Sequence, residues 1–323
     1  MKIGILGAGG IAGAMAYTVN HMDEAEGYAI GSRSIEKAKA FAEKYGFEKA
    51  YGSYDEVLAD PEVQLVYVAL PHSHHYEWTI KALNAGKHVL CEKAFAANAQ
   101  QAREMIELSE KKGLLLTEAI WTRYMPAKKI ITDLVDSGII GKPCTIAANL
   151  GARIDMNERL VNPALAGGAL LDLTVYPLTF ASMVWGDDIK RISASCVMTD
   201  TGVDGQDTVM LEYNDGRMAS LFTTIYGPTT STGVVTGTEG YIEAIGINNP
   251  GKIIVHVSGK SEPDIINVPP QISGYEYEVL SSIKAIEEGR TECPEMPHAE
   301  TIEIMEQMDE IRRQFGIVFP FEI

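Results

Sequence analysis

The stretch that decides the fold is KIGILGAGGIA, residues 2–12. Its apolar first half predicts a β-strand over residues 2–6, and apolar residues from Ile11 to Val19 recur at helical spacing. Between strand and helix stands a GxGxxA turn: Gly7 permits the sharp bend, Gly9 lets the backbone approach a pyrophosphate, and Ala12 lets the helix pack on the strand. The helix N-terminus then offers N–H groups to phosphates. The turn predicts a dinucleotide site; the alternative is a glycine-rich turn within an α/β core.

The pattern around this turn divides the chain into two domains. Strands alternate with helices up to about residue 122, which predicts a doubly wound parallel sheet, a Rossmann domain over residues 1–122. The expected strands are 2–6, 28–31, 65–70, 87–91 and 114–117. We expect residues 123–323 to form a second α+β domain. Its predominantly antiparallel open sheet has expected strands 145–150, 189–199, 208–213, 218–224, 234–236, 241–245 and 252–257, with helices near 171–184, 275–288 and 299–315.

Composition narrows the possible partners. The 323 residues carry 27 Lys and Arg against 44 Asp and Glu, a net charge of −17. So acidic a chain disfavours nucleic acids and anionic membrane surfaces as partners. The four cysteines form no CxxC pair, which argues against a zinc knuckle or a redox dithiol and favours a cytoplasmic protein. Ala14-Met15-Ala16 mimics a signal-peptide cleavage site, but the preceding glycines are too many for a helical signal segment.

The end of the second strand indicates which nicotinamide cofactor binds. NAD enzymes place an acidic residue there for the ribose 2′-hydroxyl. This chain has Gly-Ser-Arg-Ser at 31–34, where Ser32 can donate a hydrogen bond and Arg33 can pair with a 2′-phosphate. Lys37, one helical turn on, adds positive charge. The sequence therefore favours NADP over NAD; the alternative is that Arg33 is an ordinary solvated loop residue.

Three histidines follow the most apolar strand, in Pro71-His72-Ser73-His74-His75. A doubly wound sheet presents its ligand loops at this edge. We expect His72 or His75 to contact the dinucleotide and His74 to be solvated. A metal site is the alternative, but no Cys or Asp cluster accompanies the histidines, so no metal is predicted.

A candidate acid–base group lies far downstream, in GGALLDLTVY at 167–176. Asp172 and Tyr176 stand four positions apart and so share a helix face. Carbonyl reduction needs a proton donor while hydride arrives from nicotinamide, and a tyrosine serves if a lysine favours its phenolate. Lys93, at the end of the fifth strand in Cys91-Glu92-Lys93, is the candidate. The alternatives are a helix cap for Asp172 and a core aromatic for Tyr176.

Taken together, these motifs resemble the Gfo/Idh/MocA family, named for glucose–fructose oxidoreductase and inositol 2-dehydrogenase. The likeness rests on the GxGxxA turn, Ser-Arg-Ser at 32–34, AGKHVLCEK at 85–93, GGALLDLTVY and the Gly-Thr-Glu-Gly turn at 237–240. EAIWTRYMP at 118–126 is most similar to the dimeric dihydrodiol dehydrogenase branch, which also includes NADP-dependent xylose dehydrogenases.

The resemblance implies an active site between two domains, with Lys93, Asp172 and Tyr176 as catalytic residues. It implies that residues 123–323 bind substrate and mediate dimerisation, with the open sheet face pairing with a second subunit to give a homodimer or larger even assembly. Trp121 would stack near nicotinamide or substrate, unless it is a core aromatic. Two positions depart from the family pattern: Ala94 replaces a proline after the lysine, and His72 replaces an asparagine.

The leading functional hypothesis is an NADP-dependent oxidoreductase acting on a secondary alcohol or carbonyl of a sugar, polyol or trans-dihydrodiol. A non-catalytic dinucleotide sensor and an NAD-dependent glycoside-cleaving enzyme are the alternatives. The residues expected at the cofactor are Gly7, Gly9, Gly10, Ile11, Ala12, Ser32, Arg33, Lys37, Leu70, Pro71, His72, His75, Glu92, Lys93 and Trp121.

Overall fold

The computed structural model describes residues 1–322, which form two compact units. Unit 1 comprises Met1–Tyr124 and Gln271–Ile302, and unit 2 comprises Met125–Pro270 and the chain from Glu303 onward. The chain first passes from unit 1 to unit 2 after Tyr124, two residues beyond the boundary expected at residue 122. The sequence assigned all of 123–323 to the second domain, whereas the structure groups Gln271–Ile302 with unit 1.

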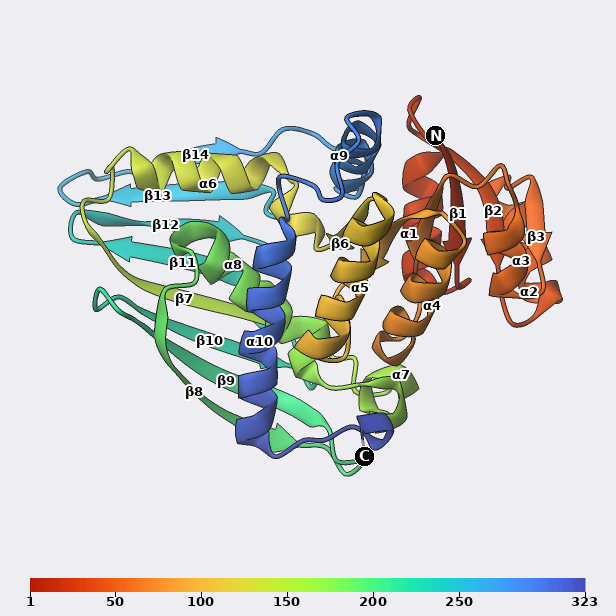
Figure 1. Cartoon of the computed structure of the whole chain (residues 1–323). Helices are drawn as coiled ribbons and strands as arrows, with labels where there is room; N and C mark the ends of the chain where they lie inside the picture. Colours follow the sequence, from red (N-terminus) through yellow and green to blue (C-terminus); the bar gives the residue numbers. More distant parts are fainter. Residues whose placement is uncertain (323) are drawn as a thin grey trace. The chain divides into compact units, whose positions relative to one another are not determined.

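Unit 1 is built on a six-stranded parallel sheet with strand order β3-β2-β1-β4-β5-β6 (Figure 1). This order belongs to doubly wound dinucleotide-binding folds. The strands are β1 (Lys2–Leu6), β2 (Glu26–Gly31), β3 (Lys49–Tyr51), β4 (Leu65–Val68), β5 (His88–Glu92) and β6 (Leu116–Ala119). The helices are α1 (Gly10–Val19), α2 (Ile35–Tyr45), α3 (Tyr54–Ala59), α4 (His72–Asn84), α5 (Ala99–Lys112), η1 (Trp121–Arg123) and α9 (Glu276–Glu287).

Helix α9 packs into the core of unit 1, and this packing explains why residues 271–302 belong to unit 1 and not to unit 2. Val279 and Ile283 of α9 are buried in one apolar cluster with Ile5 of β1 and Tyr67 of β4. Burial of such side chains stabilises the unit by roughly 25 cal/mol per Å² of apolar surface. The sequence predicted the α9 helix but not its attachment, because an amphipathic pattern does not say which core covers it.

Unit 2 is built on an eight-stranded sheet with strand order β14-β13-β12-β11-β7-β10-β9-β8. All its pairs are antiparallel except β7 with β10, which confirms the expected second fold class. The strands are β7 (Pro143–Gly151), β8 (Ile189–Met198), β9 (Asp204–Tyr213), β10 (Met218–Thr224), β11 (Thr232–Gly237), β12 (Gly240–Ile245), β13 (Lys252–Val257) and β14 (Asp264–Asn267).

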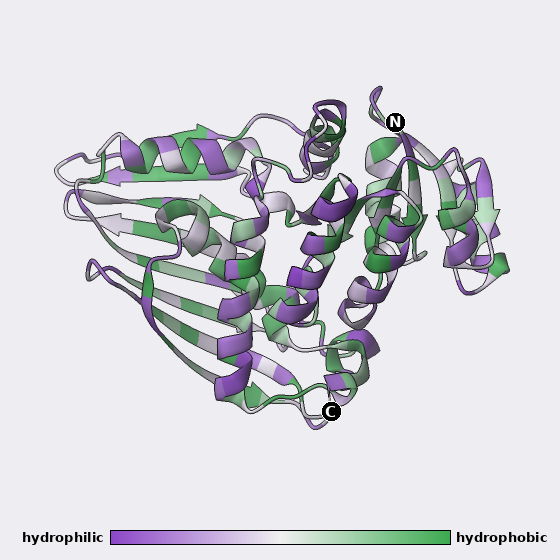
Figure 2. Cartoon of the chain, viewed as in Figure 1, coloured by the Kyte–Doolittle hydropathy of each residue, from purple (hydrophilic) through white to green (hydrophobic). Residues whose placement is uncertain are grey.

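Helices pack on one face of this sheet, where α8 contacts β7 and β10 and α6 contacts β12. The helical segments are α6 (Pro126–Asp136), α7 (Glu158–Val161), η2 (Pro163–Leu165), η3 (Leu170–Thr174), α8 (Val175–Trp185), α10 (His298–Phe315), which begins in unit 1, and η4 (Pro320–Glu322). Figure 2 shows apolar residues interleaved with polar ones along the strands, as expected when one face of a sheet is covered.

One helical stretch, Pro163–Trp185, is long and apolar enough to cross a membrane by length and composition. Its apolar window is 89% buried inside the protein. This segment is therefore apolar because it is a core helix, packed against the sheet of unit 2.

Candidate active site

The glycine turn of unit 1 fits a dinucleotide phosphate. Gly7 has φ +103°, and a Cβ there would lie 2.5 Å from the carbonyl oxygen of Ala69, so only glycine is accommodated. Gly9 and Gly10 are exposed, and a Cβ on either would meet no atom within 4 Å. Helix α1 begins at Gly10 with no side-chain cap and no acidic residue in its first turn. Its N–H groups therefore face open space, as a pyrophosphate requires; Ile11 and Ala12 follow in this first turn.

The second strand ends at residues suited to a 2′-phosphate. Ser34 caps α2 by accepting a hydrogen bond from Lys37 N at 3.3 Å, and Ser32 is buried with its Oγ accepting from Ser34 N. Arg33 is exposed and lies beside Tyr54. Burial raises the pKa of Tyr54, and the positive charge of Arg33 partly offsets this rise. Lys37 is exposed in the first turn of α2. The strand end thus presents one guanidinium and one ammonium group to solvent.

The histidine segment differs from the expected loop. Pro71 is the N-cap of α4, which begins at His72; its φ of −61° and ψ of 149° are the extended angles typical of an N-cap residue. His72 is buried, and His74 is half-buried with a pKa lowered by burial and by the charge of Arg33. The solvated loop expected at His74 is therefore the first turn of a helix.

His75 lies between backbone carbonyl groups of two different segments. Its Nε2 lies 2.8 Å from the carbonyl oxygen of Leu70 and its Nδ1 lies 2.9 Å from that of Ala94. The side chain is fully buried, and burial lowers its pKa to about 4. The neutral ring carries one N–H, so His75 donates to one of these two carbonyl oxygens and packs against the other.

Lys93 follows β5 and is half-buried, and its peptide bond to Ala94 is cis. The preceding Glu92 is buried, with one carboxylate oxygen accepting from Tyr67 Oη and the other accepting from Lys93 N at 3.2 Å. Trp121 is 8% exposed and stacks on Tyr275, with ring centroids 4.2 Å apart. Trp121 thus packs on an aromatic partner that sequence reasoning did not identify.

In unit 2, Asp172 and Tyr176 lie on consecutive turns of one helical segment. Asp172 is in the centre of the π-helical turn η3, and Tyr176 is the second residue of α8. Both are 8% exposed. Arg159 Nη2 donates to Asp172 Oδ1 at 3.0 Å, which keeps the carboxylate paired. π-helical turns occur frequently at functional sites. Asp172 does not act as the N-cap that was its alternative interpretation, because η3 carries no side-chain cap.

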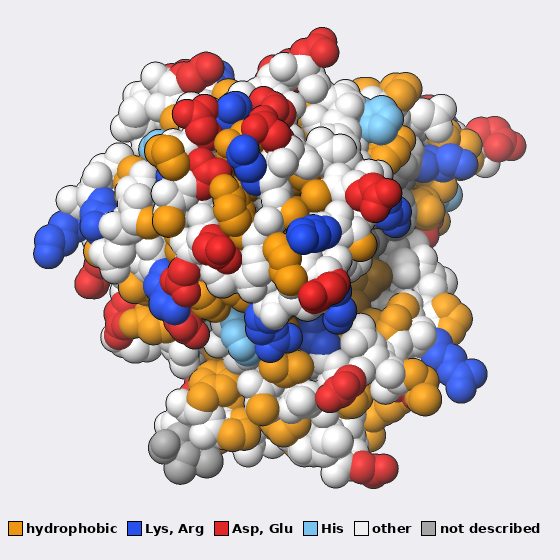
Figure 3. Space-filling view, turned by 90° about the vertical axis from the view of Figure 1, so that its right-hand side faces the viewer, with side chains coloured by type: hydrophobic (Ala, Val, Ile, Leu, Met, Phe, Trp, Pro, Cys, Tyr) orange, Lys and Arg blue, Asp and Glu red, His pale blue; other side chains and the backbone are white. Residues whose placement is uncertain are grey.

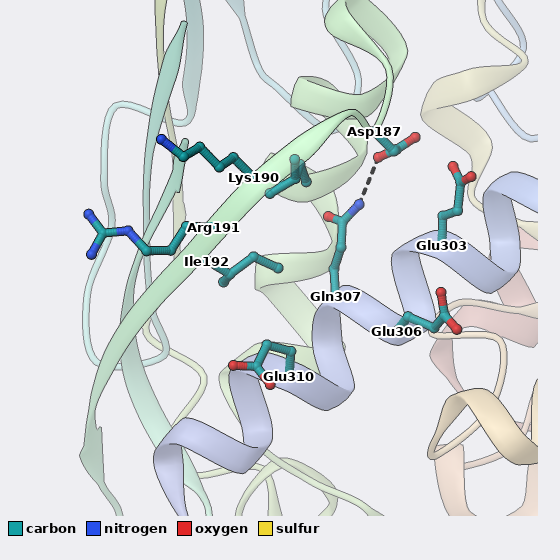
Figure 4. A pocket seen from close by; sticks show the side chains of 9 residues that line it. Asp187, Lys190, Arg191, Ile192, Glu303, Glu306, Gln307 and Glu310 are labelled. Carbon is teal, nitrogen blue, oxygen red and sulfur yellow. Dashed lines mark hydrogen bonds between the residues drawn. The ribbon is translucent and has the colours of Figure 1, made fainter. Parts of the chain in front are cut away.

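The groove between β8 and α10 contains none of the predicted site residues. Its volume is about 590 Å³, and Figure 4 shows Glu303, Glu306 and Gln307 on the α10 side, with Gln307 Nε2 donating to Asp187 Oδ1 at 2.7 Å. Lys190 and Arg191 point away from α10 in this view. An acidic wall does not suit a phosphate-bearing cofactor. Within residues 1–322, no three His, Cys, Asp or Glu side chains are placed to hold a metal ion.

A parallel sheet of this order, with an uncapped glycine turn at its first helix, defines a dinucleotide-binding domain of the Rossmann class. Residues 1–120 match the family described as oxidoreductases with an NAD-binding Rossmann fold, GFO_IDH_MocA, and residues 129–243 match the C-terminal domain of the same family. The chain belongs to the Gfo/Idh/MocA family, which confirms the resemblance drawn from the motifs.

Relatives with assigned activities cover nearly the whole chain. Trans-1,2-dihydrobenzene-1,2-diol dehydrogenase from Bos taurus is 34% identical over 303 residues, 90% of this chain and 89% of that protein. The Mus musculus enzyme is 32% identical over 99% of this chain and 98% of its own. These matches agree with the dihydrodiol dehydrogenase branch that residues 118–126 indicated.

Solved structures share the fold of both units. KijD10, a 3-ketoreductase from Actinomadura kijaniata in complex with NADP and TDP-benzene, superposes with a TM-score of 0.89 at 26% identity over 97% of each chain. Aldose-aldose oxidoreductase from Caulobacter crescentus superposes with a TM-score of 0.88 at 25% identity over 98% of this chain and 97% of that one. The chain is an NAD(P)-dependent oxidoreductase.

Proposed function

We propose that the protein transfers a hydride between NADP and a secondary alcohol or carbonyl carbon of a sugar, polyol or trans-dihydrodiol. The observation that carries this proposal is the pairing of Asp172 with Arg159 one helical turn from Tyr176. A buried tyrosine beside a fixed carboxylate suits proton exchange with a substrate hydroxyl. The relatives that act on a dihydrodiol and on sugars support the substrate class.

When bound, NADPH would supply the hydride and NADP would accept it, and residues of the chain itself transfer the proton. Tyr176 gives its phenolic proton to the carbonyl oxygen during reduction and takes it back during oxidation. A positive charge near a reacting phenol favours its phenolate form, and we propose Lys93 for this role. Asp172, held by Arg159, orients the substrate hydroxyl.

The cofactor is NADP. Gly9, Gly10 and the N-terminus of α1 receive the pyrophosphate, and Arg33 receives the 2′-phosphate. Figure 3 shows Lys and Arg side chains intermixed with Asp and Glu on one face of the molecule, so the net charge of −17 does not make every surface repel phosphate.

The protein is a cytoplasmic homodimer that joins through the open face of the eight-stranded sheet. This face carries apolar side chains at exposed alternating positions, among them Met210, Met218, Tyr241 and Ile265, which are 38–57% exposed. Side chains of this kind gain free energy when a second copy covers them. Light scattering should give twice the chain mass, and Met218→Lys with Tyr241→Lys should give the monomer; a wild-type monomer at micromolar concentration would contradict the dimer.

A panel of sugars, polyols and trans-dihydrodiols tests the proposed function. The purified protein and NADP should produce NADPH with at least one class, and Tyr176→Phe should abolish most of that signal while still binding NADP. If the protein binds NADP but forms NADPH with none of these classes, the result would favour the non-catalytic sensor hypothesis.

A further inference from the structure

Two buried aspartates lie beneath the π-helical turn that carries Asp172. Asp204 and Asp207 belong to β9 and are 2% and 1% exposed. The register between β8 and β9 shifts between Val197 and Met198, which pair with Gln206 and Asp204. This bulge brings two side chains three positions apart to the same covered side of the sheet, where the charge of Asp204 acts on Asp207.

Each aspartate holds a different end of the turn. Asp204 Oδ2 accepts a hydrogen bond from Leu170 N, at the first residue of η3. Asp207 Oδ2 accepts from Thr174 Oγ1 at 2.7 Å, at the last residue of η3. Asp172 stands between these two attachments. The pair therefore fixes η3 at both ends.

Two neighbouring residues, Gly168 and Thr223, also accommodate the aspartate pair and its contacts. A Cβ at Gly168, where φ is +122°, would lie 2.2 Å from Asp204 Oδ1, so the second glycine of the GGALLDL segment makes room for this carboxyl group. Thr223 Oγ1 of β10 lies 2.6 Å from Thr174 Oγ1 and completes the contact from the neighbouring strand.

Two adjacent carboxylates cannot both stay ionised in such a place. Burial raises the pKa of both aspartates, and for Asp207 the charge of Asp204 adds to the effect. Cys196 of β8 and Tyr226 also face the pair, and neither brings a positive charge. A proton held between the two carboxyl groups relieves this repulsion.

We propose that Asp204 and Asp207 share one proton and act as positioning residues, which hold the π-helical turn so that Asp172 and Tyr176 meet the substrate in the reactive orientation. The inference rests on the proposed function, because it assigns Asp172 and Tyr176 to the reaction. Asp204 and Asp207 themselves contact no substrate. Their effect is on orientation, and a displacement of about 1 Å can cost about 10²-fold in rate.

The kinetic test compares three substitutions of the buried network with a matched control. Asp207→Ala and Thr174→Val should each lower kcat about 10- to 100-fold and leave the Kd for NADP unchanged, because the glycine turn belongs to unit 1. Asp207→Asn should restore kcat to within about threefold of wild type, since a neutral amide replaces a protonated acid. Asp200→Asn, the same change at an exposed position, should leave kcat unchanged.

An infrared experiment detects the shared proton and does not depend on catalytic activity. The infrared difference spectrum of wild type against Asp207→Asn at neutral pH should show loss of a protonated carboxylic C=O band, which Asp200→Asn should not show. An absent band, or wild-type kcat in both Asp207→Ala and Thr174→Val, would overturn the inference. An inactive wild type that retains the band would instead refute the proposed function alone.

Discussion

Glu278 makes the stability of the protein depend on pH in a way that one substitution can isolate. This side chain of α9 is fully buried, and neither carboxyl oxygen has a hydrogen-bond partner among the described residues. Burial, with a smaller contribution from the charge of Glu92, raises its pKa well above the ordinary value of 4.5. The folded protein therefore keeps a proton on Glu278 that the unfolded chain releases.

The sign and size of the effect follow from this difference. Because the folded pKa is the higher one, the stabilising contribution is complete below pH 4.5 and is lost as the pH rises toward the folded pKa. Each pH unit in that window costs about 1.4 kcal/mol. Glu278→Gln cannot ionise, so its free energy of unfolding should rise relative to wild type by about 1.4 kcal/mol between pH 5.5 and pH 6.5.

Urea unfolding of both proteins at several pH values measures this difference. His75 contributes in the opposite direction, since its folded pKa of about 4 is depressed, but it is present in both proteins and cancels in the comparison. Glu287→Gln, on the exposed side of the same helix, is the control and should show no pH-dependent difference. A constant difference between Glu278→Gln and wild type across the window would refute the reasoning.

Three further predictions concern the cofactor and the chemistry. Gly7→Ala should weaken NADP binding about 5- to 150-fold in a titration, because the backbone strain costs about 1–3 kcal/mol; unchanged affinity would show that the turn tolerates a side chain. Arg33→Ala should raise the Kd for NADP about 10- to 150-fold and leave that for NAD unchanged, and equal losses for both would contradict a 2′-phosphate contact. Tyr176→Phe should lower kcat about 10²–10⁴-fold in steady-state assays, and combining it with Lys93→Met should cost much less than the product of the single losses; multiplicative losses would mean that the two residues act independently.

Local signals in the sequence predicted the parts of the fold that depend on neighbouring residues. The glycine turn and the continuous apolar strand β4 are each readable from a few adjacent positions. The short elements β3 and α3 were missed, because three strand residues and one and a half helical turns give too little periodicity.

The supporting residues of the candidate site are invisible to such signals. Asp204 and Asp207 stand three apart, a spacing that a regular strand sends to opposite faces, and only the bulge brings them together. Arg159 reaches Asp172 from a short helix with no motif of its own. Glu278 looks like an ordinary polar position of an amphipathic helix until α9 packs into the core of unit 1.

Transfer of a labelled hydride tests the central claim most directly. The most active alcohol from the substrate panel would be prepared with deuterium on its carbinol carbon and incubated with the wild-type protein and NADP. The account predicts one deuterium in the nicotinamide ring of the NADPH formed, measured by mass spectrometry, and a rate that falls with Tyr176→Phe. Product formed without deuterium in NADPH would contradict hydride transfer between this substrate and the cofactor.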